Sequence, residues 1–499
     1  MKRVKRKRSF NLIDRITLAI LGILLLSFVP RPSHAVFKLS EQDVVLIVLR
    51  QNLEILAASF DPQIAQTLVT EVKSRFDILI SGQVRYNIDR SAQQSIVFGT
   101  DNRQVLYEAN AAKKFSFGME GRVYMSNQRD TTNSAFATDP AFWERRLGFE
   151  VKAPFLKNRF GKSDRGEVAF AKAQKEVTQE TSLEVLNNQV YEAVTTYWNL
   201  VASYYYLKLS KRFLGRALEF QRVTQEKRVI GLSEDPDVLA AEALVEERRV
   251  EILRANNLIK DFEEELKNRL DLKLKDKIRP KDKLYTKAKI PSEAYIFEKA
   301  LENRNDYQAL LKDAKARDIQ IAVAKDQKLP GLDLFTSLEL NSVDPSYGTV
   351  LGQTLSAQNP NWVIGAQFNL NFENRLAKSA LDRSRLEKAQ LLVNIKKVEN
   401  FIALKIFEAH REWKLQRKET FKFSKIATLQ RKRVEIEEKN YLQGRSSSDI
   451  IVRFQTDWLQ AEKSRLDSEL REKLAGVDLR FIMSILIPED LKKLPGETS

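Results

Sequence analysis

Residues 391–413 read LLVNIKKVENFIALKIFEAHREW. Apolar side chains recur in this stretch at steps of three and four positions, which places them on one face of a helix. They are Leu391, Ile395, Val398, Ile402, Ile406, Ala409 and Trp413. The stretch lies within residues 376–443, which contain no glycine or proline and are followed by Gly444. At about 1.5 Å per residue the predicted helix is about 100 Å long, more than a compact domain can use.

The chain contains this arrangement twice. A second long helix is predicted at residues 167–230, where Gly215 is the only interruption and Gly231 follows. A shorter helix follows each terminal glycine, at 238–270 and at 449–487. The arrangement recurs after about 215 residues, which is longer than the period of solenoid repeats. The predicted structural repeats are residues 36–290 and 291–499.

Shorter segments complete each repeat. Helices are expected at residues 40–74, where Ser40 and Asp43 give a capping signal, and at 292–329. Residues 273–290 form a basic linker. Because the shorter helices after each glycine are only about half as long as the long ones, segments 40–74 and 292–329 are expected to run beside the remaining half.

The first 35 residues have the features of a signal peptide. Six of the first eight residues are basic, an apolar stretch follows at 18–29, and Ser33-His34-Ala35 provides a small-x-small cleavage site. The mature chain is then expected to begin at Val36. The alternative is an uncleaved membrane anchor, and both interpretations predict export.

Composition argues against several functions. Without residues 1–35 the chain has 75 basic and 66 acidic residues, a net charge of +9, spread along predicted helix faces, so no nucleic-acid interface is expected. The chain has no cysteine and, after cleavage, one histidine, His410, which excludes the usual zinc and redox spacings. It has no phosphate-binding loop, nucleophile elbow or dinucleotide fingerprint. We therefore expect no enzyme activity, cofactor or metal.

Four segments alternate apolar and polar residues as strands do. They are residues 77–89, 147–155, 331–341 and 363–372. In the last, Ala366 and Phe368 would face one side and Gln367 and Asn369 the other. A soluble sandwich shows the same alternation. However, each segment has about the length of a tilted membrane-crossing strand, and each pair of segments precedes a long helix.

Residues 90–144 leave the number of strands open. Residues 115–126 alternate like a further strand. A chain that enters and leaves a barrel on the same side needs an even number of strands. Either residues 103–109 are a strand as well, or one candidate lies outside the membrane.

Several local motifs resemble one family. They are Ala300 to Asp306, residues 324–334 with Leu329-Pro330, Ala153-Pro154-Phe155, Asn158 to Gly161, and Arg228 to Ser233. With the duplication, they resemble the TolC-type outer-membrane factors of Gram-negative efflux and type I secretion systems, although Asn305 stands where that family usually has proline. The resemblance covers essentially the whole mature chain. No single motif is specific, but their order is.

The resemblance implies a mixed α and β fold and a homotrimer. Three chains would share a β-barrel in outer-membrane lipid, continued by a long α-helical barrel across the periplasm. The assembly would be a passive exit duct that works with a periplasmic adaptor (membrane fusion) protein and an inner-membrane transporter; drugs, proteins and metal ions all remain possible cargo. Four strands cannot close a barrel alone, so chains would have to pool them. The alternative is an exported periplasmic coiled-coil scaffold or adaptor without a channel, which leaves the strands unexplained.

The resemblance also implies functional residues at the two tips, where each long helix turns. The implied adaptor-binding residues are Arg228, Gly231, Leu232, Ser233, Gly444, Arg445 and Ser446. The alternative is that both glycines serve only as helix C-caps. Asp449 matches the first of the aspartates that narrow the periplasmic end of the pore in this family, but Val452 and Arg453 stand where another carboxylate is common. The alternative for Asp449 is a helix N-cap.

Overall fold

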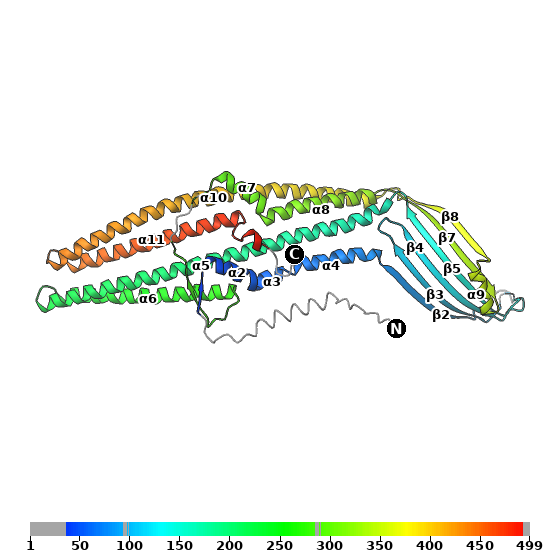
Figure 1. The fold of residues 1–499 in the computed structure, drawn as a ribbon, viewed down its shortest axis with the longest axis horizontal. Helices are drawn as coiled ribbons and strands as arrows, with labels where there is room; N and C mark the ends of the chain where they lie inside the picture. Colours follow the sequence, from blue (N-terminus) through cyan, green and yellow to red (C-terminus); the bar gives the residue numbers. More distant parts are fainter. Residues whose placement is uncertain (1–35, 93–96, 98, 285–288, 290, 493–499) are drawn as a thin grey trace, which may run out of the picture. The chain divides into compact units, whose positions relative to one another are not determined.

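The computed structural model describes residues 36–92, 97, 99–284, 289 and 291–492 (Figure 1). The predicted signal peptide lies outside these residues. The chain divides into two compact units, each built from segments of both sequence halves. Over the described residues, the helical unit comprises residues 36–56, 187–291 and 408–481, and the sheet unit comprises residues 57–186, 292–407 and 482–492. The units therefore do not coincide with the predicted repeats.

The helices are mostly where the sequence predicts them. Two 68-residue helices, α5 (Lys162–Val229) and α10 (Arg375–Leu442), contribute to both units, and two 35-residue helices follow them, α6 (Asp235–Arg269) and α11 (Ser448–Ile482). The others are α2 (Glu41–Gln51), α3 (Leu53–Ala58), α4 (Asp61–Lys73), α7 (Glu293–Asn303), α8 (Asn305–Gln327), α9 (Tyr347–Leu355) and the 3₁₀ turns Ser74–Phe76, Arg159–Gly161 and Glu489–Leu491. The predicted helix at 40–74 is thus three helices, and α9 was not predicted. None of the helices described here combines the length and hydropathy needed to span a membrane.

Most of the apolar stripe that predicted α10 is buried, and Val398 and Ala409 are half-buried. Ile402 is 0% and Trp413 6% exposed, and His410 is buried among the same helix turns. The long helix α5 runs through Gly215 without a break. These helices therefore form because one face of each can be covered along most of its length.

Aromatic and charged side chains hold the N-terminal segment in the helical unit. Ser40 and Asp43 form the predicted capping box at the start of α2. Trp198 Nε1 donates to Glu41 Oε2 at 2.9 Å, and Arg480 Nη1 donates to the other oxygen of Glu41 at 2.6 Å. In the segment predicted as a linker, β6 (Lys277–Pro280) pairs in parallel with β1 (Val36–Leu39).

The sheet unit contains one antiparallel sheet of six strands in the order β2-β3-β4-β5-β7-β8 (Figure 1). They are β2 (Ile78–Asp89), β3 (Asn102–Lys114), β4 (Glu120–Thr132), β5 (Ala141–Pro154), β7 (Gly331–Asp344) and β8 (Pro360–Asn369). Both β3 and β4 lie in the stretch whose strand number the sequence left open, so the described residues of this sheet form six strands, an even number.

The prediction of a strand at residues 115–126 is partly wrong. Residues 115–119 form the turn between β3 and β4, in which Gly118 has φ +90° and its N–H donates to Phe115 O at 2.8 Å. Phe115 and Phe117 stack on each other in this turn with ring centroids 5.3 Å apart. Their alternation therefore reflects a turn and not a sheet face. Likewise, β8 ends at Asn369, before the predicted end at residue 372.

The register gives the sheet two faces of opposite character. Val123, Phe149 and Leu338 lie in one row across β4, β5 and β7, on what we call the apolar face. The neighbouring row, Arg122, Glu150 and Ser337, lies on the polar face. The apolar face is uncovered over much of its area. Its exposed residues include Ile80, Val84, Trp362 and Ile364, each more than 65% exposed.

Candidate functional site: the two helix hairpins

The first hairpin joins α5 to α6 through a Schellman motif. Gly231 has φ +79°, its N–H donates to Arg228 O at 3.0 Å, and Leu232 N–H donates to Lys227 O at 2.8 Å. An added Cβ on Gly231 would meet no atom within 4 Å. Glycine is therefore favoured here by the backbone angle and not by crowding.

The second hairpin joins α10 to α11 in the same way. Gly444 has φ +73°, its N–H donates to Tyr441 O at 3.1 Å, and Arg445 N–H donates to Asn440 O at 2.9 Å. Both glycines thus act as helix C-caps. This capping is the structural role that the sequence offered as an alternative. It involves only backbone groups, so it does not prevent the flanking side chains from contacting a partner.

The surfaces of the two hairpins differ. The first hairpin exposes apolar side chains, with Val229 at 87%, Ile230 at 68% and Leu232 at 70%. Beside them Arg228 forms an ion pair with Asp235 at 2.5 Å. The second hairpin is mostly polar and comprises Gln443, Gly444, Arg445, Ser446 and Ser447. An apolar partner surface would therefore match the first hairpin better than the second.

One hydroxyl connects the helices behind the two hairpins. The Tyr441 hydroxyl of α10 lies 3.0 Å from Thr224 Oγ1 of α5 and 3.0 Å from Ser448 Oγ of α11. Lys227 of α5 hydrogen-bonds the backbone oxygen of Tyr441 and lies over its ring, 3.8 Å from the centroid. Phe220 packs against the same ring, with centroids 5.4 Å apart. Each of these groups is buried, so the contact is a specific one.

A groove of about 610 Å³ lies beside this contact. Apolar side chains from both hairpins line it, among them Ile230, Leu232 and Leu442. Charged groups lie at the same groove, where Glu438 accepts hydrogen bonds from Arg216 at 3.1 Å and from Gln455 at 3.2 Å. A groove with an apolar floor and fixed charges suits a helical segment better than a small polar molecule.

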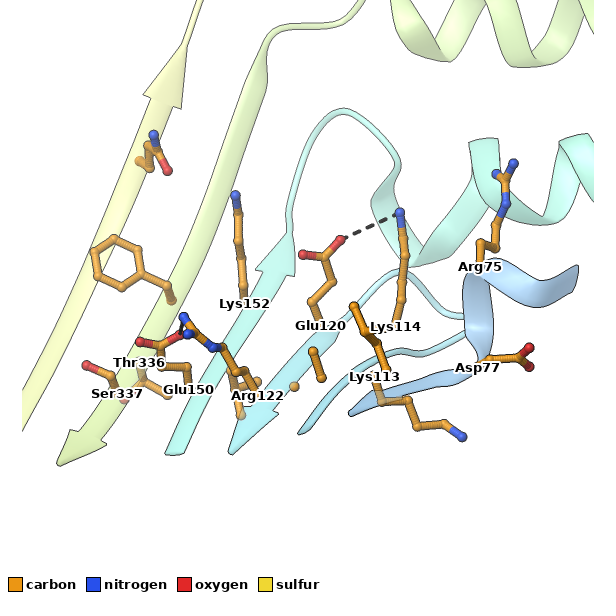
Figure 2. A pocket seen from close by; sticks show the side chains of 16 residues that line it. Arg75, Asp77, Lys113, Lys114, Glu120, Arg122, Glu150, Lys152, Thr336 and Ser337 are labelled. Carbon is orange, nitrogen blue, oxygen red and sulfur yellow. Dashed lines mark ion pairs between the residues drawn. The ribbon is translucent and has the colours of Figure 1, made fainter. Parts of the chain in front are cut away.

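A second cavity, of about 570 Å³, lies on the polar face of the sheet (Figure 2). Three of its basic side chains form ion pairs: Lys114 with Glu120 at 3.6 Å, Arg122 with Glu150 at 3.5 Å, and Lys152 with Asp333, which lies outside the cavity lining, at 3.0 Å. These pairs link neighbouring strands or the two ends of a turn. Since these three basic side chains already have carboxylate partners, we interpret this cavity as part of a hydrated wall.

Comparisons with solved structures identify the fold. The CmeC outer membrane channel of Campylobacter jejuni matches with a TM-score of 0.66 and 17% identity, over 90% of this chain and 87% of that one. The open-state MtrE outer membrane channel of Neisseria gonorrhoeae matches with 0.63 and 15%, over 89% and 88%. The outer membrane protein VceC of Vibrio cholerae matches with 0.65 and 12%, over 89% and 95%. The chain has the TolC-type fold.

The resemblance seen in the sequence is therefore confirmed as a likeness of fold. Sequence identities this low do not show which residues of this chain have which role. No family model and no curated protein sequence matches the chain. Among the described residues, no three or more His, Cys, Asp or Glu side chains are grouped so that they could hold a metal ion.

Within the TolC-type fold, the predicted residues fall on the two hairpins. Asp449 is the second residue of α11 and is exposed, so it is not the N-cap that the sequence offered as an alternative. The sequence did not point to Tyr441, Thr224 or Lys227. Their role depends on contacts between residues more than 200 positions apart, and no local pattern encodes it.

Proposed function

We propose that this chain is the outer-membrane exit duct of an efflux or type I secretion system, active as a homotrimer that extends into the periplasm. The main support is the sheet, which has an exposed apolar face and a charged polar face. An exposed apolar surface of this extent is unfavourable in water. It suits a strand assembly with lipid outside and water inside.

Trimerisation would close the sheet into a barrel. In the single chain, β2 and β8 each have one unpaired edge, and open edges cannot lie in lipid. Because the sheet has an even number of antiparallel strands, β8 of one chain can pair antiparallel with β2 of the next. Three chains of six strands would give eighteen, instead of the twelve that four strands per chain would give. Barrels of about this size enclose an aqueous channel.

The helices would continue the duct, and the long helices of both repeats would form its wall. The two halves have long helices of equal length, 68 residues, and following helices of equal length, 35 residues. We propose the repeat boundary near residue 290 on this basis. We also propose that the duct itself has no enzymatic step and that an inner-membrane transporter supplies the energy.

The hairpins would bind the periplasmic adaptor. The predicted residues Arg228, Gly231, Leu232 and Ser233 lie beside the exposed apolar side chains of the first hairpin. Gly444, Arg445 and Ser446 form the second hairpin. We propose that three copies of Asp449, exposed in the first turn of α11, narrow the pore at this end.

Single-channel recording tests the proposal. The full chain is expressed with residues 1–35 and extracted from outer membranes in detergent. The mass of the extracted complex is measured, and the complex is inserted into a planar bilayer. We expect a mass of three chains and discrete conductance steps. A soluble species without conductance would refute the duct and favour the periplasmic scaffold.

A further inference from the structure

An arginine is buried on the apolar face of the sheet. Arg145 of β5 lies in one row with Asn127 of β4 and Ser342 of β7, in the middle strands of the sheet. It is only 9% exposed. Because β5 has a neighbour on both sides, this position lies away from the strand edges that the proposed trimer would join.

Arg145 has no acidic partner among the described residues. Its Nη2 donates to Met125 Sδ at 3.3 Å, and its Nε has no hydrogen-bond partner. The Oδ1 of Asn127, in the same row, also lacks one. A buried cation without a counterion is strongly unfavourable. The described residues therefore supply no anion to neutralise Arg145 at this point of the sheet.

Helix α9 covers part of this position without supplying the missing charge. Ser342 Oγ lies 2.6 Å from Thr354 Oγ1 of α9, and the Tyr347 ring packs against Trp143 with centroids 5.0 Å apart. No residue of α9 is charged. The nearest carboxylate on the same face of the register is that of Asp344, which is paired with Trp143, and its Oδ1 accepts from Ser346 N–H instead.

A second arginine lies next to the first on the same face. Arg129 of β4 is exposed, pairs in register with Trp143, and stacks its guanidinium 5.5 Å from that ring. Arg103 of β3 is on this face too, but Asp101 neutralises it at 3.0 Å. Arg129 and Arg145 are therefore the cations left unpaired by the described residues at this edge of the apolar face.

We propose that Arg129 and Arg145 bind the phosphate of an anionic membrane lipid. The proposal rests on the proposed function, because it requires the apolar face to lie in lipid. From Ala153 to Leu147 the apolar-face residues of β5 are all apolar, and the next is Arg145, about 26 Å along the strand from Ala153. Tryptophan and tyrosine beside arginine are typical of the headgroup level. A guanidinium matches a phosphate with two parallel hydrogen bonds.

Quenching of Trp143 fluorescence by brominated lipid tests this assignment. Trp362→Phe removes the other tryptophan of the sheet, while Trp198, Trp413 and Trp458 are buried in the helical unit. The full chain is reconstituted in phosphatidylcholine vesicles containing brominated phosphatidylglycerol or brominated phosphatidylcholine. We expect the anionic lipid to quench Trp143 at about fivefold lower mole fraction, and less selectively in high salt.

Three variants assign the preference to the arginines. Arg129→Gln alters an exposed side chain and should remove most of the preference, whereas Arg145→Lys, which keeps the charge, should retain part of it. Arg85→Gln is the matched control, because Arg85 is an exposed arginine on the polar face. Equal quenching by both lipids, or the same loss in Arg85→Gln, would overturn the proposal.

The experiment also separates this proposal from the function on which it rests. With Trp143→Phe, Trp362 reports on the apolar face at a position far from both arginines in the register. Quenching of Trp362 without any lipid preference at Trp143 would refute the lipid-phosphate site and leave the proposed duct standing. No quenching of either tryptophan would mean that the apolar face is not in lipid. That result would refute both the lipid-phosphate site and the proposed duct.

Discussion

Tyr441→Phe should loosen the contact between the two hairpins. The change removes the hydroxyl that lies 3.0 Å from both Thr224 Oγ1 and Ser448 Oγ, and it leaves the ring against Phe220 and Lys227. Each buried hydrogen bond contributes about 0.5–1.5 kcal/mol. The two together predict a loss of about 1–3 kcal/mol, which raises the ratio of separated to joined hairpins about 5- to 150-fold.

The absence of native cysteines makes the separation measurable. Arg228→Cys and Arg445→Cys place one spin label on each hairpin, and pulsed electron resonance gives the distribution of distances between the labels. We expect Tyr441→Phe to broaden that distribution toward longer distances and, in the bilayer, to increase the time spent in higher conductance states. Tyr205→Phe on α5 is the control, since the structure shows no hydrogen bond from that hydroxyl. A distribution identical to that of the parent protein would refute the role of the bridge.

Three further predictions concern the hairpins and the helical unit. Gly231→Ala and Gly444→Ala should each lower the free energy of unfolding by about 1–2 kcal/mol, because the cost is that of a left-handed backbone angle without a clash; denaturant titration measures it. Burial opposes the ionisation of Glu41, but the hydrogen bond from Arg480 keeps its pKa below the usual 4.5. The stability it contributes is therefore present above pH 4.5 and lost as the pH falls through the lowered pKa, so melting curves of Glu41→Gln should depend less on pH in that range. Asp449→Ala should raise the single-channel conductance, and an unchanged conductance would exclude its gating role.

The long helices could be predicted because their determinants are local. Residues 376–443 were expected and Arg375–Leu442 is observed, a shift of one residue. The apolar period fixes the helix, and a glycine with positive φ ends it. Both signals lie within a few residues of the features they determine.

The sheet was predicted less well because its determinants are not local. Alternation marked residues 115–126 as one strand, although Gly118 turns the chain there and β4 begins only at Glu120. Pairing of β5 with β7 joins Phe149 to Leu338, and no pattern within either segment specifies that partner. For the same reason the hairpin residues at the glycines could be predicted, whereas the Tyr441 bridge could not.

The two halves of the chain differ in one way that bears on how the proposed duct can vary. Their long helices and the helices that follow them match in length, but the six-stranded sheet takes four strands, β2 to β5, from the first half and two, β7 and β8, from the second. On the proposed duplication, helix length is constrained because both hairpins must reach the same contact at Tyr441. Sheet width is not constrained in this way, since an added pair of strands keeps the chain entering and leaving the sheet on one side. In the proposed duct, the barrel can therefore widen two strands at a time while the helices stay unchanged.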